Sequence, residues 1–317
     1  MSRYIRQEIL IGRKGQDKLA KSKAVIVGIG ALGCISSELL ARAGIGKLTL
    51  IDRDIVDLSN LQRQTLYDDS DIDTPKAIAA EKRLRKINPE IKIECYATDL
   101  TSKNTALLRA GIIVDGTDNF EARRLINEYA VKNRIPWVYG AAIEDKGYIW
   151  PIMPGKPCFS CAFRQSKSTD TCETSGILNA VSSAIGAMQA NQAIRILLGR
   201  PVESRLLHVD LGQNLFTKLD VTQRPDCPVC VKGQFDYLSG KKGAKAVRFC
   251  GAGTYQIRGD KVDMSSLAGK LEAQMEVKKG NGFLHFRDIV LFEDGRALIR
   301  AKDEKQARSE YAKWIGS

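Results

Sequence analysis

The sequence predicts an α/β protein with a doubly wound, mainly parallel Rossmann-like sheet, followed by a small C-terminal α+β domain. Two observations predict the main sheet. Strand-like apolar runs alternate with helix-like segments up to about residue 140, and a glycine-rich turn directly follows the first run. A third observation, the Gly-, Lys- and Ser-rich stretch 238–245, predicts a linker. We therefore divide the chain into a main domain (1–237), this linker (238–245) and a small domain (246–317).

The main domain begins with a βαβ unit, because residues 24–28 and 47–51 predict buried strands and the segment between them a helix at about 34–42. The alternation then continues with helices covering both faces of the sheet. The next predicted elements are a helix at 75–87, a strand at 91–97, a helix at 104–110, a strand at 111–116, a helix at 120–133 and a strand at 136–142.

The rest of the main domain is less regular. Three prolines within 148–165 predict a short strand and then a loop, and the small residues of 177–199 predict a helix packed closely on the sheet. Strands at 205–211 and 215–221 complete it. The small domain is expected to contain strands within 247–258, 282–292 and 296–301, and helices at 264–275 and 303–314.

The composition is that of a globular protein, with 44% hydrophobic and 27% charged residues. The N-terminus is charged throughout and no apolar run is long enough to cross a bilayer, so we expect a cytoplasmic protein without a membrane segment. The net charge of +12 favours an acidic partner, although it is equally compatible with a basic surface that has none. The basic clusters lack interleaved aromatic residues, which makes nucleic acid the less favoured partner.

Gly28, Gly30 and Gly33 have the G-x-G-x-x-G spacing directly after the first strand. Such a turn brings backbone N–H groups and a helix N-terminus to a phosphate group. Asp52 follows the second strand, where a carboxylate commonly binds ribose hydroxyls. The pattern therefore predicts an adenine nucleotide, and it leaves open whether that nucleotide is a redox cofactor or a substrate.

The loop after the second strand favours a substrate with several phosphates. Arg63 is the candidate phosphate clamp, Asn60 and Gln64 are candidate hydrogen-bond donors to ribose or phosphate, and Lys76 adds a second cation near a helix start. Asp118 follows a later strand, at the edge of the sheet where ligands bind. Beside a triphosphate this carboxylate is a natural magnesium ligand, whereas alone it could equally be a helix cap.

Eight cysteines in a chain without an export signal suggest metal binding or catalysis before disulfides. Two C-x-x-C pairs offer the four thiolates of a closed, structural zinc site, with disulfide pairing as the alternative. These cysteines are Cys158, Cys161, Cys227 and Cys230.

Cys172 is different, because it precedes a predicted helix in a polar segment where a thiol can be exposed and activated. Its alternatives are a covalent role and a dispensable residue. Cys34, Cys95 and Cys250 lie in predicted helices or strands and are interpreted as core residues.

Several motifs together resemble the ThiF/MoeB/HesA family, the prokaryotic relatives of ubiquitin-activating enzymes. They occur in family order and span about residues 3 to 232. Besides the two C-x-x-C pairs they are RYIRQ (3–7), GIGALG (28–33), LSNLQRQTL (58–66), TPKA (74–77), DGTDNFEAR (115–123) and TCETSGIL (171–178).

The resemblance implies an enzyme that binds ATP with Mg²⁺ and adenylates the C-terminal glycine of a small β-grasp carrier protein ending in Gly-Gly, with release of pyrophosphate. It further implies a homodimer, in which Arg6 reaches the phosphates bound by the neighbouring subunit; without the resemblance, Arg6 would be a solvated terminal charge. Ala31 stands where many relatives have glycine, which the loop tolerates if φ is negative there. The implied roles are ribose binding for Asp52, phosphate binding for Asn60, Arg63 and Lys76, magnesium binding for Asp118 with its neighbour Asn119 at the ATP, and a thioester or sulfur transfer for Cys172.

The pathway stays open at this point. The NLQRQ motif favours a sulfur carrier, whereas the position of the small domain resembles the domain by which eukaryotic activators recruit a conjugating enzyme, so either a sulfur donor or such an enzyme could act downstream. ATP-dependent activation of a small molecule or a tRNA base by the same fold is the alternative function. A nicotinamide oxidoreductase leaves the NLQRQ and TDN motifs unexplained, and a binding protein without catalysis leaves the intact set of site residues unexplained.

Overall fold

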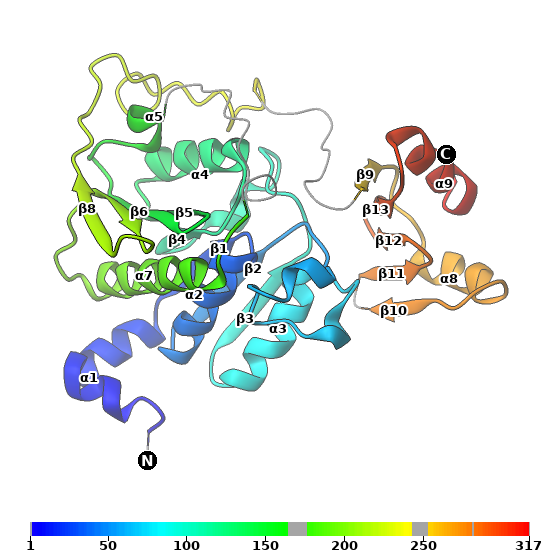
Figure 1. Ribbon diagram of the computed structural model, residues 1–317, viewed down its shortest axis with the longest axis horizontal. Coiled ribbons are helices and arrows are strands. Elements are labelled where there is room, and N and C mark those ends of the chain that lie inside the picture. The colour runs from blue at the N-terminus through cyan, green and yellow to red at the C-terminus, as the bar shows by residue number, and fades with distance from the viewer. Residues whose placement is uncertain (1, 164–175, 243–252, 281, 317) are drawn as a thin grey trace. The chain divides into compact units, whose positions relative to one another are not determined.

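The computed structural model describes residues 2–163, 176–242, 253–280 and 282–316, and the chain folds into two compact units, Met1–Gly243 and Ala244–Ser317 (Figure 1). Cys172 and Cys250 lie outside the described residues. Within the described ranges, no helix is both long and apolar enough to span a bilayer.

The first unit is built on an eight-stranded sheet with the strand order β3-β2-β1-β4-β5-β6-β7-β8. The pairings from β3 to β5 are parallel, and β6, β7 and β8 add antiparallel strands at one edge. This confirms the expected mainly parallel, Rossmann-like sheet. Its strands are β1 (Lys23–Val27), β2 (Lys47–Ile51), β3 (Lys92–Tyr96), β4 (Ile112–Asp115), β5 (Trp137–Ile143), β6 (Lys146–Ile152), β7 (Leu206–Asp210) and β8 (Leu215–Leu219).

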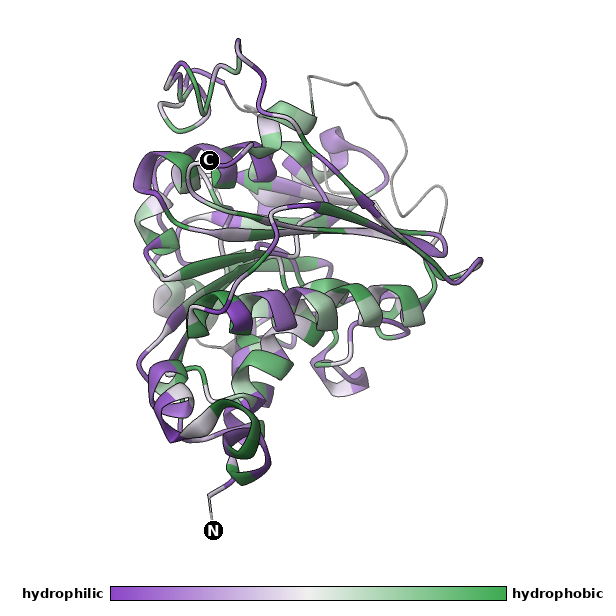
Figure 2. Ribbon diagram, turned by 90° about the vertical axis from the view of Figure 1, so that its left-hand side faces the viewer, coloured by the Kyte–Doolittle hydropathy of each residue, from purple (hydrophilic) through white to green (hydrophobic). Residues whose placement is uncertain are grey.

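Helices cover both faces of this sheet (Figure 1). One face packs against α1, α2, α3 and α7 through a core that includes Leu40, Leu84 and Ile185, and the other against α4 and α5 through Ile126 and Phe159. Hydrophobic residues are prominent along the central strands in Figure 2. The helices are α1 (Ile5–Ala20), α2 (Ala31–Arg42), α3 (Lys76–Ile87), α4 (Phe120–Asn133), α5 (Phe159–Ala162) and α7 (Asn179–Leu198).

Three local expectations were wrong or incomplete. The helix expected at 104–110 is a single 3-10 turn, η3 (Thr105–Leu108), because Asn104 uses its side chain to hold the preceding turn through Thr101 N–H and the Asp99 carbonyl. The loop expected after the short strand within 148–165 contains the helix α5. No element was predicted from the sequence for the helix α1, which non-helical Gly12 (φ 72°) interrupts.

Chain order and strand order together place the ligand edge of the sheet. From β1 the chain winds outward to β2 and β3, then returns to β4 on the other side of β1 and continues to β5. The carboxyl ends of β1 and β4 therefore lie side by side at the point where the winding reverses, which is where doubly wound sheets bind ligands.

The second unit is a five-stranded antiparallel sheet of order β10-β11-β12-β13-β9 with two helices, an α+β arrangement as expected. Asp263 and Asp303 cap the N-termini of its helices with their carboxylates. Leu271, Phe286 and Ile299 lie in its own hydrophobic core. The elements are β9 (Thr254–Arg258), α8 (Met264–Glu272), β10 (Lys278–Gly280), β11 (Phe283–Phe286), β12 (Ile289–Phe292), β13 (Arg296–Arg300) and α9 (Glu304–Trp314).

Candidate active site

The glycine-rich loop after β1 packs backbone against backbone on the loop after β4. Gly28 has φ 83°, and a Cβ added there would lie 2.6 Å from the carbonyl oxygen of Gly116. A Cβ on Gly33 would lie 2.0 Å from the carbonyl oxygen of Gly28. At Gly30 the nearest atom, the oxygen of Gly116, is 4.0 Å away. Two of the three predicted glycines are thus required by the fold, and the third leaves open backbone for a ligand.

The N-terminus of α2 lies at the same loop and carries no side-chain cap at Gly30, nor an acidic residue in its first turn. Its first N–H groups therefore remain available to an anion, as expected of a phosphate-binding turn. Ala31 is the first residue of this helix and has no positive φ. The alanine is accordingly tolerated at this position.

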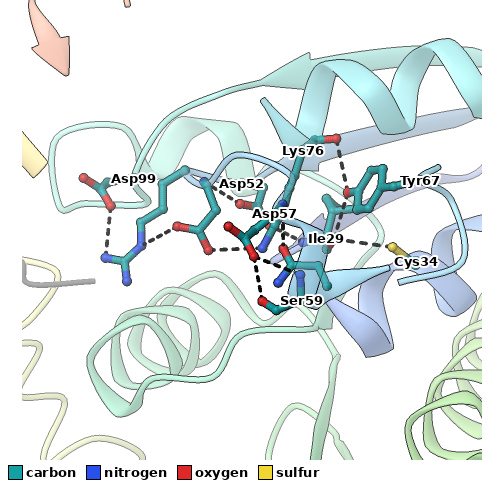
Figure 3. A network of polar contacts seen from close by, with 11 residues as sticks. Ile29, Cys34, Asp52, Asp57, Ser59, Tyr67, Lys76 and Asp99 are labelled. Carbon is teal, nitrogen blue, oxygen red and sulfur yellow. Dashed lines mark hydrogen bonds and ion pairs between the residues drawn. The ribbon is translucent and has the colours of Figure 1, made fainter. Parts of the chain in front are cut away.

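Asp52, at the end of β2, faces the glycine loop from the neighbouring strand (Figure 3). Its carboxylate accepts hydrogen bonds from the backbone N–H groups of Ile29, at 2.5 Å, and Asp54, at 2.7 Å. Burial, followed by the neighbouring Asp54 carboxylate, raises the pKa of Asp52 to about 6, against the opposing effect of Lys76. Asp52 is thus a buried acceptor fixed to the glycine-rich loop.

Lys76 begins α3 and is buried, with 6% of its surface exposed. Its Nζ lies 3.4 Å from an Asp54 carboxylate oxygen. Burial lowers the pKa of Lys76, but the carboxylates of Asp54, Asp52 and Asp118 outweigh it and raise the pKa overall. The ammonium group therefore stays charged among acidic groups, as a cation for phosphates must.

Two side chains that hydrogen-bond to the backbone of the glycine loop were not predicted from the sequence as part of the site. The Tyr67 hydroxyl donates to the Ile29 carbonyl at 2.8 Å, and the Cys34 thiol donates to the same oxygen at 3.5 Å (Figure 3). Tyr67 also donates to the Lys76 carbonyl at 3.2 Å. Cys34 is fully buried as expected, whereas Cys95 is only half-buried and donates to Glu81. A buried Tyr in the LSNLQRQTLY segment gave no signal, because its partners lie far away in sequence.

The loop after β2 contains the other predicted phosphate ligands around the 3-10 turn η1 (Leu58–Asn60). Asn60 Oδ1 accepts from the backbone N–H of Asp57, which holds the turn. Arg63 is half-buried and donates to the carbonyl of Ser59 at 2.8 Å, so most of its guanidinium donors stay free for a ligand. Gln64 is buried, and its Oε1 has no hydrogen-bond partner among the described residues.

The loop after β4 shows that Asp118 is not the helix cap of α4. The helix cap of α4 is Asn119, whose Oδ1 accepts from the N–H of Ala122 at 2.8 Å. Asp118 is exposed, and its carboxylate makes no hydrogen bond or ion pair with any residue that the structure describes. The carboxylate of Asp118 is thereby free to bind a ligand, while the side-chain oxygen of Asn119 is used by the fold.

Asp118 nevertheless acts on the same cations as Asp54, since both carboxylates contribute to the raised pKa values of Lys76 and Arg53. Arg53, another residue that sequence reasoning missed, lies 3.3 Å from Asp99 and 3.7 Å from Asp54. The alternating DRD at 52–54, directly after a strand, could have signalled it. Alternating cations and carboxylates thus line the carboxyl ends of β2 and β4.

Arg6 is the predicted site residue that the single chain does not bring to this place. It is exposed near the start of α1, and no hydrogen bond or ion pair connects it to another described residue.

The four cysteines of the two C-x-x-C pairs come together in the first unit. Their Sγ atoms all lie within 4.8 Å of one another, with Cys158 and Cys227 3.8 Å apart and Cys161 and Cys230 3.5 Å apart. A disulfide would need about 2.05 Å, whereas two thiolates on a tetrahedral zinc ion are about 3.8 Å apart. These four cysteines form no disulfide in this structure, and their clustered thiols could hold a metal ion.

Comparison with known proteins identifies the family of this chain. The model of the ThiF family matches residues 4–229. The chain is 40% identical to the sulfur carrier protein ThiS adenylyltransferase of Bacillus subtilis, over 99% of both chains. It is 38% identical to the molybdopterin-synthase adenylyltransferase of Escherichia coli, over 73% of this chain and 96% of the relative. It is also 36% identical to the SAMP-activating enzyme E1 of Haloferax volcanii, over 75% and 92%.

Among solved structures, E. coli MccB with MccA-N7isoASN has a TM-score of 0.66 over 73% of this chain and 75% of its own, at 23% identity. That likeness concerns the fold. The family match, together with relatives above 35% identity that span nearly their whole length, assigns the activity class. The chain therefore belongs to the ThiF family, and it is an adenylyltransferase.

Proposed function

We propose that this enzyme uses ATP to adenylate the C-terminal glycine of a small sulfur-carrier protein ending in Gly-Gly. The observation that carries the proposal is the buried Lys76 among Asp52, Asp54 and Asp118, beside the uncapped N-terminus of α2. This arrangement suits a polyphosphate and makes no provision for a nicotinamide ring. The relative from B. subtilis, named for the sulfur carrier ThiS, supports a carrier of that kind because it matches both units of this chain.

In the proposed reaction, the glycine carboxylate of the carrier attacks the α-phosphorus of ATP. A new carboxyl–phosphate bond forms, the bond to the bridging oxygen breaks, and pyrophosphate leaves with the electron pair. Both reactants are anionic, so the main task of the site is to stabilise negative charge. Asp52 binds the ribose hydroxyls, the glycine loop binds the phosphates with its N–H groups, and Lys76 and Arg63 stabilise the developing charge.

Asn60 and Gln64 assist in the same loop. The Asn60 side chain both holds η1 and offers its amide N–H groups, while the unpartnered Oε1 of buried Gln64 is an acceptor for a hydroxyl or a water. Asn119 contributes through its backbone and the amide nitrogen, since its side-chain oxygen caps α4.

Asp118 is the residue that we propose for Mg²⁺. Its exposed carboxylate, which pairs with no residue that the structure describes, is the kind of oxygen donor that Mg²⁺ prefers beside phosphates. Bound there, the ion would neutralise charge on the leaving pyrophosphate.

The cysteine cluster fits Zn²⁺ in a structural role. Four sulfur ligands at these separations complete a tetrahedron and leave no open position for catalysis. We therefore propose that zinc ties the segment around α5 to the segment 227–230.

Two further proposals concern groups outside the single described site. Arg6 is proposed to act in a homodimer, where its exposed guanidinium reaches the phosphates bound by the partner subunit. Cys172 is proposed to take the activated carrier as a thioester or to take part in sulfur transfer. A sulfur donor, rather than a conjugating enzyme, then acts downstream, because the full-length relative is named for a sulfur carrier.

The test is ATP–pyrophosphate exchange with candidate Gly-Gly-ending carriers, followed by non-reducing gels. Arg63→Ala should lower exchange at least about 100-fold while leaving stability within about 0.5 kcal/mol, because Arg63 donates only to Ser59. Arg42→Ala, which removes only an exposed pair with Glu38, is the matched control. Normal exchange in the Arg63 variant would remove the central assignment.

The gels separate the finer proposals. A thiol-sensitive enzyme–carrier band that disappears in Cys172→Ala supports the covalent role, and a band that persists contradicts it. No exchange with any carrier would shift the substrate to a small molecule or a tRNA base.

A further inference from the structure

The backbone between β4 and α4, which presents Asp118, is held by a buried ion pair rather than by Asp118 itself. Asp115 is fully buried at the end of β4. One of its carboxylate oxygens accepts from the N–H of Thr117, at 2.9 Å, and from the Thr117 hydroxyl, at 2.7 Å. The other accepts from Nε of Arg123 at 3.2 Å. Asp115 thus fixes the loop at Thr117, two residues further along the chain.

Arg123 fixes the loop from the other side. It lies in the first turns of α4 with 7% of its surface exposed. Its Nη2 donates to the carbonyl of Thr117 at 2.5 Å and to the carbonyl of Gly140, on β5, at 3.2 Å. The guanidinium is 5.1 Å from the ring centre of Tyr139. A single planar group therefore joins the end of β4, the next strand and the peptide unit that leads into Asp118.

A side chain on the opposite face of the sheet also holds the backbone at Asp115. Gln189 of α7 is fully buried and donates to the carbonyls of Asp115, at 2.7 Å, and Val138, at 3.1 Å. Gly140 has no room for a side chain, since a Cβ there would lie 2.4 Å from the Gln189 amide nitrogen. Polar side chains from both faces thus converge on the backbone around Asp115.

We propose that Arg123 is a positioning residue for the reaction, which acts through Asp115 and the Thr117 carbonyl to set where the Asp118 carboxylate stands. The Asp118 side chain has no hydrogen-bond or ion-pair partner among the described residues, so within this part of the chain its location depends on this backbone. A displacement of about 1 Å at a reacting group can cost about 100-fold in rate. The proposal rests on the proposed function, because that function makes Asp118 the ligand of a divalent cation.

An apolar core of the same shape would not need the buried ion pair between Asp115 and Arg123. A buried ion pair contributes little net stability compared with apolar residues of similar volume. Arg123 donates to three acceptors around the Asp118 loop, namely the Asp115 carboxylate and the carbonyls of Thr117 and Gly140. None of these acceptors is an unpaired carbonyl at the end of a helix. The ion pair is therefore interpreted as serving position rather than stability.

The test is Arg123→Lys, with Arg42→Lys as the matched control on an exposed ion pair. A lysine keeps the charge but cannot reach three acceptors in different directions. In the full-length protein, Mn²⁺ binding to the enzyme–ATP complex is titrated by electron paramagnetic resonance, and the Mg²⁺ dependence of exchange is measured in parallel. We expect affinity for ATP in EDTA to stay within about twofold of the parent protein and the half-saturating Mn²⁺ and Mg²⁺ concentrations to rise about tenfold.

A variant with unchanged metal half-saturation that has lost only thermal stability would overturn the proposal, since a purely structural role predicts that result. If Arg123→Lys does not fold, Asp115→Asn tests the same link, because its amide keeps one acceptor for Thr117 and loses the charge that faces Arg123. Failure of the proposed function is distinguishable: the unmodified enzyme would then show no exchange with any carrier, while the Mn²⁺ titration would still report on Arg123.

Discussion

Replacing Lys76 with methionine tests the electrostatics of the site most directly. Lys76 is 6% exposed, so methionine fills a similar volume while the charge is removed. The ammonium group lies 3.4 Å from Asp54, and it also lowers the pKa of Asp52. The variant therefore leaves buried carboxylates without their cation, in addition to abolishing the proposed stabilisation of phosphate charge.

The magnitude follows from the ion pair that the variant breaks. Burial already raises the pKa of Asp52 from 3.8 to about 6 with Lys76 present, so removing the ammonium group makes this carboxyl still harder to ionise. Breaking a buried ion pair typically costs about 3–5 kcal/mol. Because the Asp54 side chain is 33% exposed and partly screened, we expect Lys76→Met to lose about 3 kcal/mol at pH 7.5.

The pH dependence has a definite sign. A carboxyl group whose folded pKa is raised stabilises the fold fully below its ordinary pKa, and this contribution is lost as the pH rises through the folded value. For Asp52 that window runs from 3.8 to about 6. Without Lys76 the pKa of Asp52 rises further, so the window extends to higher pH. The difference between variant and parent should thus be smaller at pH 5 than at pH 7.5, because Asp52 is largely protonated in both at the lower pH, while the loss of the Lys76–Asp54 pair remains.

Urea unfolding at pH 5 and pH 7.5, followed by tryptophan fluorescence, measures this difference. Trp137 and Trp150 are buried in the first unit, and Trp314 belongs to the second. A Trp314→Phe background therefore makes the signal report on the first unit alone. Lys82→Met, at an exposed position of the same helix, is the control. Equal losses for the two lysine variants, or a larger loss at pH 5 than at pH 7.5, would refute the reasoning.

Two other predictions concern the glycine loop and the cysteine cluster. Gly33→Ala should destabilise the first unit by about 3 kcal/mol or more, because its Cβ would lie 2.0 Å from the Gly28 carbonyl. Gly30→Ala, with 4.0 Å to the nearest atom, should fold normally but weaken ATP binding about tenfold. Urea unfolding measures the stability of both variants and calorimetric titration measures their affinity for ATP. A destabilised Gly30 variant with normal ATP affinity, beside a Gly33 variant of normal stability, would contradict the prediction. Metal analysis should find one zinc per four-cysteine cluster. Removal of the zinc by a chelator should lower the stability by about 3 kcal/mol, which corresponds to about 6–12 °C in the unfolding temperature. Iron in place of zinc, or an unfolding temperature that does not respond to the chelator, would contradict the zinc site.

Much of the site could be predicted from sequence because its signals are local. The G-x-G-x-x-G spacing, the strand before it and Asp52 after the next strand are separated by few residues, and each has a direct physical role in one βαβ unit. Parallel strands also bring their carboxyl ends to one edge. The positions of Lys76 and Asp118 near that edge followed from counting strands.

Other features gave no local signal. Whether Asp118 or Asn119 caps α4 depends on one hydrogen bond, and two neighbouring polar residues look alike in sequence. The helix α1 was not predicted, and non-helical Gly12 splits it. The crossover at 104–110 looked helical by composition, but Asn104 and Thr101 formed a turn instead.

The sequence by itself determined the fold class, the glycine loop and the candidate site residues near it, because backbone conformation and hydrophobic periodicity act over short distances along the chain. The tertiary structure decided which distant groups meet. Tyr67 reaches Ile29 across 38 positions, and Arg123 reaches Gly140 across 17. Such contacts depend on how completed elements pack, and side-chain chemistry alone contains no record of that packing.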